Sequence, residues 1–304
     1  MALIGSKALQ VIFDQPRSDG TFENQTLQYL REVGEYRSIL LLAFAPKAAG
    51  TYFRQAAIYA VDGQLVRIAH AQGGRDGTPY LPTVLVCCLD SDAPDTITHI
   101  HMQALAANRH FIEAFGLKPI IMNRSIPDML ASFWDMLELD PTARAEGLNC
   151  QIPDNFIEQS RAQKADFMVD VIAPWYASYY ATWKSFVDDA PETICVLHYK
   201  DFCADPTTSL HAALAHAGFF ISRAKCSASL DRVWRERSIY RYHKGKQGRG
   251  KEYFSSLHVE KLRRLLSYYP QLEPWSPELM GYSEAVLLHQ EPAQIFATCI
   301  QKVA

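Results

Sequence analysis

The chain has 304 residues, of which 48% are hydrophobic and 21% are charged. This proportion is enough for an ordinary packed core and excludes a mainly disordered protein. The 30 Lys and Arg residues nearly balance the 33 Asp and Glu residues, and the formal net charge of −3 argues against nucleic acid or an anionic membrane as a partner.

The sequence lacks the marks of an exported or membrane protein. Its longest apolar run, Ile39–Ala45, is far shorter than the roughly 20 residues needed to span a bilayer. The N-terminal segment does not have the basic start, apolar centre and small-residue cleavage site of a secretory signal. Seven Cys residues without a C-x-x-C pair are typical of buried thiols in a reducing compartment. We therefore expect a cytoplasmic protein that does not bind a membrane.

After a mixed, polar lead-in over residues 1–37, strand-sized apolar runs alternate with helical patterns. The runs that predict strands are Ser38–Phe44, Thr83–Leu89, Ile97–Met102 and Lys118–Asn123. The patterns that predict helices are Thr51–Val61, Gln103–Phe115 and the segment from Ser125 to Leu139. In the last of these, Ser125 can cap the helix, Pro127 fits its first turn and Asp128 suits its positive end.

The second half begins with the polar segment Asp140–Lys164, which we expect to be a long mobile insertion. Regular elements follow, in the order helix, strand, helix. They are Val169–Val187, Thr193–Tyr199 and Pro206–Ala217. A basic, glycine-containing stretch, Arg232–Lys251, comes next, and a helical pattern resumes beyond Ser255. Alternating strands and helices predict an α/β fold, with a mostly parallel central sheet that is flanked by helices.

The turn after the first predicted strand has residues suited to a phosphate. Small residues at positions 48–50 let the backbone approach an anion closely. Lys47 adds a positive charge and Thr51 a hydroxyl, where a helix begins with unpaired N–H groups. An ordinary turn with a solvated lysine explains this segment equally well. A P-loop NTPase is disfavoured, because Gly245–Lys251, which comes close to a Walker A loop, is followed by Glu252 instead of Ser or Thr.

Two further segments have residues that bind anions. Arg124 follows a predicted strand, at the end where open α/β sheets bind ligands, and Ser132 lies eight residues later on a predicted helix. An arginine there can hold a phosphate through two parallel hydrogen bonds. The alternative is an arginine paired with a carboxylate and a packed helix serine. The stretch Tyr242–Lys251 interleaves glycines and cations, which suits either a cover over an anion or a solvated loop.

In combination, four segments resemble motifs of the sulfotransferases that use 3′-phosphoadenosine 5′-phosphosulfate (PAPS). Pro46–Thr51 resembles the loop at the 5′-phosphosulfate, and Asn123–Ser132 resembles the motif at the 3′-phosphate. His198–Pro206 resembles the segment that reaches the adenine, and His243–Gly248 resembles the late loop over the 3′-phosphate. The motifs occur in family order between residues 46 and 251.

The chain departs from the family pattern at three places. His243 replaces the usual arginine of the late loop, and Gly248-Arg249-Gly250 stands where the family has G-D-W. Tyr52 stands where many members have the tryptophan that stacks on the adenine, which keeps an aromatic surface there.

The resemblance implies a P-loop-NTPase-like sulfotransferase fold in a single domain, 1–304, with a donor-binding and catalytic core at 38–255 and a helical segment at 256–304. It implies PAPS as the donor, adenosine 3′,5′-bisphosphate (PAP) as the product and no metal. The residues that it places on the donor are Lys47, Ala48, Ala49, Gly50, Thr51, Tyr52, Arg124, Ser132, Tyr199, His243, Lys244 and Gly245. Of these, Lys47 is also implied to stabilise the leaving phosphate.

The resemblance also implies a histidine base at the end of a strand before Arg124. His99 and His101 are the two candidates, and His101 has the spacing closer to that of the family. Since both would point to the same face of a strand, both are expected at the site. A metal site that includes Asp90 and Asp92, or a pair of merely structural histidines, are the alternatives.

These observations predict an enzyme that moves a sulfuryl group to a hydroxyl or amine of a small-molecule acceptor, of the metabolite or natural-product kind. The alternatives are a catalytically silent nucleotide-binding module of the same fold and a Mg²⁺-dependent, kinase-like phosphotransferase. The aromatic residues between Trp175 and Trp183 either line the acceptor pocket or belong to the core. The sequence is compatible with a homo-oligomer.

Overall fold

A computed structural model of the chain describes residues 39–69, 79–80, 83–84, 95–146, 150–236 and 247–281. Several predicted features lie outside the described residues. They are the lead-in 1–37, Asp90, Asp92, His243, Lys244, Gly245, most of the strand expected at Thr83–Leu89, and residues 282–304 of the expected helical segment 256–304.

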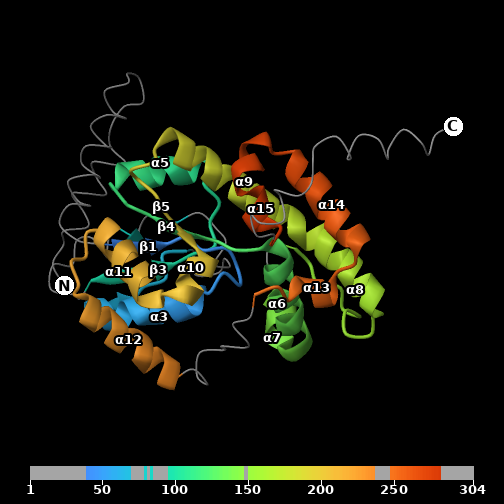
Figure 1. Ribbon diagram of the computed structural model, residues 1–304, viewed down its shortest axis with the longest axis horizontal. Helices are drawn as coiled ribbons and strands as arrows, with labels where there is room; N and C mark the ends of the chain where they lie inside the picture. The colour runs from blue at the N-terminus through green and yellow to red at the C-terminus, as the bar shows by residue number, and fades with distance from the viewer. Residues whose placement is uncertain are drawn as a thin grey trace.

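Within the described ranges, five short strands form one parallel sheet with the order β2-β3-β1-β4-β5 (Figure 1). The strands are β1 (Ile39–Leu42), β2 (Gln64–Leu65), β3 (Thr96–His99), β4 (Ile120–Asn123) and β5 (Cys195–His198). All residues of β1, β3 and β4 are buried, as expected of strands that are covered on both faces, although three of the four residues of β3 are polar. The predicted α/β fold with a parallel sheet is therefore confirmed.

Helices cover both faces of the sheet. The α-helices are α3 (Gly50–Val61), α5 (Ala106–Ala114), α6 (Ile126–Leu139), α7 (Pro141–Glu146), α8 (Arg161–Phe167), α9 (Ala173–Asp189), α10 (Tyr199–Ala204), α11 (Pro206–His216), α12 (Arg223–Arg235), α13 (Gly250–Tyr253), α14 (Ser256–Ser267) and α15 (Ser276–Leu279). A π-helical turn, η1 (Met168–Ile172), joins α8 to α9, and a 3₁₀ turn, η2 (Pro270–Trp275), precedes α15.

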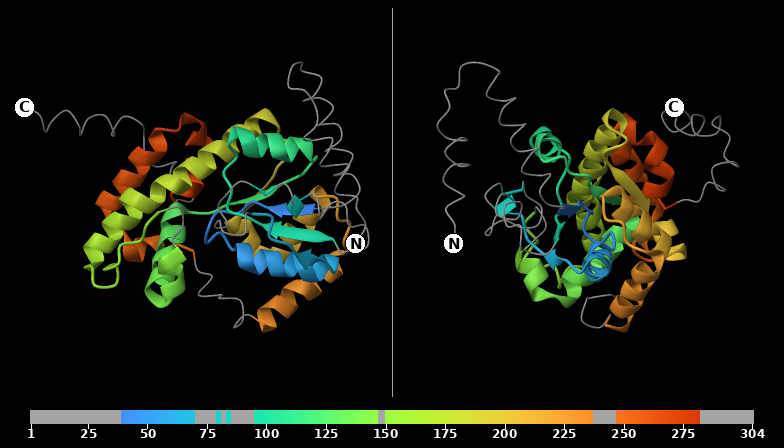
Figure 2. Two further views of the ribbon diagram at one scale, coloured as in Figure 1. Left: turned by 180° about the vertical axis from the view of Figure 1, so that it is seen from behind. Right: turned by 90° about the vertical axis from the view of Figure 1, so that its left-hand side faces the viewer.

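The helices form two layers and a lateral group. α3 and α12 lie on one side of the sheet, and α5 and α9 lie on the other (Figures 1 and 2). α6, α7 and α8 gather with α13 and α14 beside the sheet (Figure 2). Among the helices of the described ranges, none has the length and apolar character that a membrane crossing requires.

The structure differs from the sequence-based expectations at four places. The segment Asp140–Lys164 is not a structureless insertion, since it contains α7 and the first turn of α8 and buries Ile152 and Phe156. The basic stretch expected from Arg232 begins inside α12, which the sequence analysis missed. Thr83 and Val84 are helical where a strand was predicted, and the two-residue edge strand β2 was not predicted.

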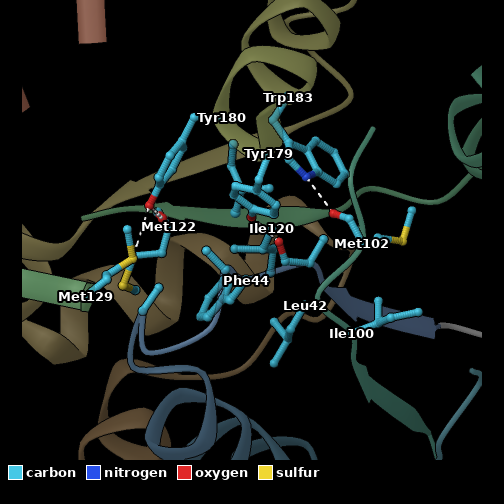
Figure 3. Close-up of a cluster of buried hydrophobic side chains, with 14 of the residues drawn as sticks. Leu42, Phe44, Ile100, Met102, Ile120, Met122, Met129, Tyr179, Tyr180 and Trp183 are labelled. Carbon is cyan, nitrogen blue, oxygen red and sulfur yellow. Dashed lines mark hydrogen bonds between the residues drawn. The ribbon is translucent and has the colours of Figure 1, made fainter. Parts of the chain in front are cut away.

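The aromatic residues of α9 belong to the core (Figure 3). Tyr176, Tyr179, Tyr180 and Trp183 are each at most 1% exposed. The hydroxyl of Tyr180 donates to the carbonyl of Met122 at 3.1 Å, and the indole of Trp183 donates to that of Met102 at 2.9 Å. The hydroxyl of Tyr179 donates to the carbonyl of Ala43. These bonds join α9 to the chain at the carboxyl ends of the central strands. The core interpretation is therefore confirmed for these four residues, while Trp175 is half-buried at the edge of the core.

Candidate active site

The turn between β1 and α3 has a strained backbone. Lys47 and Ala49 have φ angles of 64° and 66°, a region that residues with side chains seldom adopt and that costs of order 1–3 kcal/mol each. Positive and negative φ angles alternate along this turn, and such alternation can arrange successive N–H groups around an anion. α3 begins at Gly50 without a side-chain cap on its first turn. The turn therefore has the features of an anion cradle at a helix N-terminus.

One of the expected phosphate-facing N–H groups is used within the turn. The N–H of Ala48 donates to the carbonyl of Ala45 at 3.1 Å. The first N–H that bonds within α3 is that of Phe53, which donates to the carbonyl of Ala49 at 3.0 Å. The N–H groups of Gly50 and Thr51 consequently lie in the first helical turn, which is where a phosphate would be bound.

Buried side chains hold the carbonyl groups of the turn. The ring Nδ1 of His101 donates to the carbonyl of Phe44 at 2.6 Å. The hydroxyl of Tyr176 donates to the carbonyl of Pro46 at 3.1 Å. Because these donors come from separate parts of the chain, the conformation of the turn is imposed by the tertiary structure.

Arg124 meets this turn from the adjacent strand β4. Its side chain is buried, and its Nη1 donates to the carbonyl of Lys47 at 2.5 Å. Its guanidinium carbon lies 4.1 Å above the centre of the Tyr199 ring, which follows β5. The structure thus brings together Lys47, Arg124 and Tyr199, one from each of three predicted motifs. They meet at the carboxyl ends of neighbouring strands, where open α/β sheets bind ligands.

Ser132 lies on the face of α6 that the Lys47 side chain reaches. α6 begins as predicted, with Ser125 as the cap that accepts from the N–H of Asp128 at 3.4 Å. The Lys47 ammonium lies 3.7 Å from the sulfur of Met136, one turn beyond the half-buried Ser132 on the same helix face. Lys47 and Ser132 are therefore on the same side of the molecule.

The two candidate histidines are buried and in contact. The ring centres of His99 and His101 are 4.8 Å apart, with the ring planes at 86°. Donation from Nδ1 of His101 to the carbonyl of Phe44 assigns the hydrogen of the neutral ring to Nδ1, which leaves the lone pair on Nε2. His99 packs on the start of α3, because a Cβ at Gly50 would lie 2.3 Å from its Nε2. Both rings therefore lie beside the turn that carries Lys47.

Tyr52 is turned toward α10 and α12. Its ring centre is 6.0 Å from that of Phe202 on α10, in an edge-to-face arrangement, and its hydroxyl is 3.4 Å from the carbonyl of Leu230 on α12. The metal site weighed as an alternative includes Asp90 and Asp92, which lie outside the described residues; among the described residues, no three metal-ligating side chains cluster.

Sequence reasoning missed a link between α6 and the segment that precedes α13. The buried carboxylate of Asp128 accepts from the N–H of Gly248 at 2.7 Å and from that of Gly250 at 2.8 Å. A side chain at Gly250 would lie 2.3 Å from the Cβ of Pro127, so only glycine fits this close approach. The local sequence predicts only that the charge of Asp128 suits the helix end, because the contact with Gly248 joins residues 120 positions apart.

Arg249, one of the residues at which the sequence departs from the family pattern, forms an ion pair. The Arg249 guanidinium contacts the Asp135 carboxylate on α6 at 2.5 Å, and both side chains are largely buried. Tyr253 donates to the same carboxylate, and burial together with this bond raises the pKa of Tyr253 to about 12. The segment therefore remains tied to α6 although its sequence differs from the family motif.

No protein-family model matches the sequence, and no curated protein matches it significantly. Among solved structures, the fold is similar to that of a mouse sulfotransferase in complex with PAP. The TM-score is 0.60 at 12% sequence identity, and the similarity covers 84% of this chain and 93% of that one.

Two structures of retinol dehydratase with PAP, one with androsterone and one with retinol, have TM-scores of 0.45 and 0.44. Their identities are 12% and 11%; the matches cover 82% of this chain in both cases, and 85% and 86% of those chains. TM-scores below 0.5 do not by themselves establish a shared fold. The single α/β domain of this chain, with its parallel sheet flanked by helices, has the sulfotransferase fold.

Proposed function

We propose that this protein is a sulfotransferase that moves the sulfuryl group of PAPS to a hydroxyl or amine of a small-molecule acceptor and releases PAP. The observation that carries the proposal is the contact between Arg124 and the backbone of Lys47. A ligand with a phosphate at each of two nearby positions can bind both residues at once. The mouse sulfotransferase that shares the fold is a complex with PAP, which has this arrangement of phosphates.

The donor would be bound at three groups of residues. The first-turn N–H groups of α3 and the ammonium of Lys47 would hold the 5′-phosphosulfate. Arg124 and Ser132 would hold the 3′-phosphate. Arg124 would use the N–H groups of its guanidinium that do not bond to the carbonyl of Lys47. Tyr199, which has Arg124 over one face of its ring, would lie beside the base. His243, Lys244 and Gly245 complete the proposed donor site on the sequence motif alone.

The transfer step is an in-line displacement at sulfur. A lone pair of the acceptor oxygen or nitrogen forms the new bond to sulfur, while the bond from sulfur to the bridging phosphate oxygen breaks and its electrons leave with PAP. The Nε2 lone pair of His101 takes the acceptor proton. Lys47 and the α3 N–H groups stabilise the negative charge that develops on the bridging oxygen.

Two measurements test this function. The first is calorimetric titration with PAP, and the second is transfer of labelled sulfate from PAPS to a panel of phenols, alcohols and amines. We expect PAP to bind and label to move, and Lys47→Ala to lower turnover about 100-fold. Lys118→Ala is the matched control, because Lys118 is exposed and lies before β4, at the opposite end of the strand from Arg124. PAP binding without transfer to any acceptor would support a silent nucleotide-binding module and contradict the proposal.

A further inference from the structure

The positive φ of Lys47 needs an explanation outside the residue itself. Lysine has no intrinsic preference for this conformation, and neither neighbour in the sequence is a glycine. A strained conformation of this kind persists only where surrounding contacts determine it. The contacts that stabilise the positive φ of Lys47 must therefore act on the two peptide groups that flank it.

Each of these peptide groups is held by one buried side chain. The group before the Lys47 Cα contains the carbonyl of Pro46, which accepts from the hydroxyl of Tyr176 at 3.1 Å. The group after it contains the carbonyl of Lys47, which accepts from Arg124 at 2.5 Å. The orientations of these two planes about the Cα are the φ and ψ angles of Lys47. Tyr176 and Arg124, together with the bond from the N–H of Ala48 to the carbonyl of Ala45, therefore fix the direction in which the Lys47 side chain leaves the backbone.

Tyr176 is itself held rigidly, so it can fix the peptide group before Lys47. It is 1% exposed, it lies in the first half of the long helix α9, and the Trp175 ring packs against its ring edge-to-face at 5.4 Å. Its hydroxyl donates to the carbonyl of the peptide group before Lys47. Its effect on the chemistry would pass through Lys47.

We propose that Tyr176 is a positioning residue that holds the strained Lys47 turn in its transfer-competent conformation. This inference rests on the proposed function, since it assigns Lys47 to the leaving phosphate. Loss of the Tyr176 hydroxyl lets the peptide group before Lys47 rotate, and the ammonium then samples positions away from the bridging oxygen. A displacement of about 1 Å at such a group costs up to about 100-fold in rate.

Tyr176→Phe tests the proposal, with Tyr179→Phe as the matched control. Both residues are buried on α9 and both hydroxyls donate to a backbone carbonyl. The hydroxyl of Tyr179 contacts the backbone of Ala43 and Ala45, ahead of the two peptide groups that flank Lys47. We expect Tyr176→Phe to lower kcat about tenfold and to change KM for PAPS less than about twofold. We expect both substitutions to lower the melting temperature by similar amounts. We expect Tyr179→Phe, unlike Tyr176→Phe, to leave kcat unchanged.

Hydrogen–deuterium exchange provides a readout that needs no activity. The N–H of Ala48 is protected by its bond to the carbonyl of Ala45, so its exchange should speed up about tenfold in Tyr176→Phe and remain unchanged in Tyr179→Phe. If the wild-type protein transfers no sulfate, the proposed function fails, and this comparison still decides the role of Tyr176. Equal effects of the two substitutions on kcat, or equal exchange at Ala48, would overturn the inference.

Discussion

The guanidinium of Arg124 donates to the backbone carbonyl of Lys47 at 2.5 Å, which joins two segments 77 residues apart in the sequence. One residue thereby takes part in two features of the candidate site. It offers donors to a phosphate, and it fixes the peptide group that follows the strained Lys47. The two proposed phosphate-binding segments are therefore mechanically connected even before a ligand is considered.

Arg124→Lys should accordingly damage both binding and turnover. A lysine retains the charge but lacks the planar fork that can hold a carbonyl and a phosphate at once. We expect PAP affinity, measured by calorimetry, to fall about tenfold, and kcat to fall by a similar factor. Arg109→Lys is the control, because the Arg109 side chain, like that of Arg124, bonds to backbone carbonyl groups but lies on α5. A change in affinity with kcat intact would contradict the connection between the two segments.

His101→Asn separates the structural bond of His101 from its proposed proton transfer. The Asn amide can still donate to the carbonyl of Phe44, but it cannot accept a proton. We expect turnover to fall about 100-fold or more with little change in melting temperature, and the acidic limb of the pH–rate profile to disappear. His110→Asn, on the exposed side of α5, should leave the rate and its pH profile unchanged. An unaltered profile in His101→Asn would show that another group takes the proton.

Gly50→Ala tests the close packing of His99 on α3. The added methyl group would lie 2.3 Å from the imidazole, so the ring or the helix must shift. Overpacking of this kind costs about 1–3 kcal/mol in the free energy of unfolding, measured by urea titration. If the clash is the cause, Gly50→Ala/His99→Ala should cost less than the sum of the single substitutions. If the free-energy costs of the two single substitutions simply add, the methyl group at position 50 does not clash with the His99 ring.

Asp128→Asn tests the link between α6 and the segment before α13. The carboxylate accepts from two backbone N–H groups, and an amide oxygen is a weaker acceptor without the charge. We expect the free energy of unfolding to fall by about 1–3 kcal/mol. Asp140→Asn is the matched control, since Asp140 also accepts from two N–H groups, but at the more exposed start of α7. An equal loss in both variants would argue against a special role for Asp128.

The ion pair of His198 with Glu278 predicts a dependence of stability on pH. The hydrogen bond from Nδ1 to the Glu278 carboxylate, at 2.6 Å, raises the pKa of His198 above its ordinary value. A raised pKa in the folded state stabilises the protein fully below the unfolded value of about 6.5, and this stabilisation is lost as the pH rises through the folded value.

Urea titrations of wild type and Glu278→Gln at pH 6, 7 and 8 would measure this effect. We expect the wild type to lose its advantage over the variant as the pH rises, by less than about 1 kcal/mol, because His198 is 39% exposed. An advantage that is constant from pH 6 to pH 8 would exclude the linkage.

Much of the fold could be predicted from local patterns. The apolar runs that became β1 and β4 and the cap at Ser125 depend on residues close together in the sequence. The same holds for the lysine-bearing turn before α3 and the arginine that follows β4. Periodicity and capping act within a few residues, so a single sequence carries them.

Tertiary structure alone decided which of these residues meet. The bonds of Tyr176 to Pro46 and of Asp128 to Gly248 join residues more than 100 positions apart. No local pattern predicts them, because they depend on how the strands are ordered and how α6 and α9 pack beside the sheet. The left-handed conformation of Lys47 follows the same rule. Its residue type disfavours that conformation, and only contacts from distant parts of the chain can stabilise it.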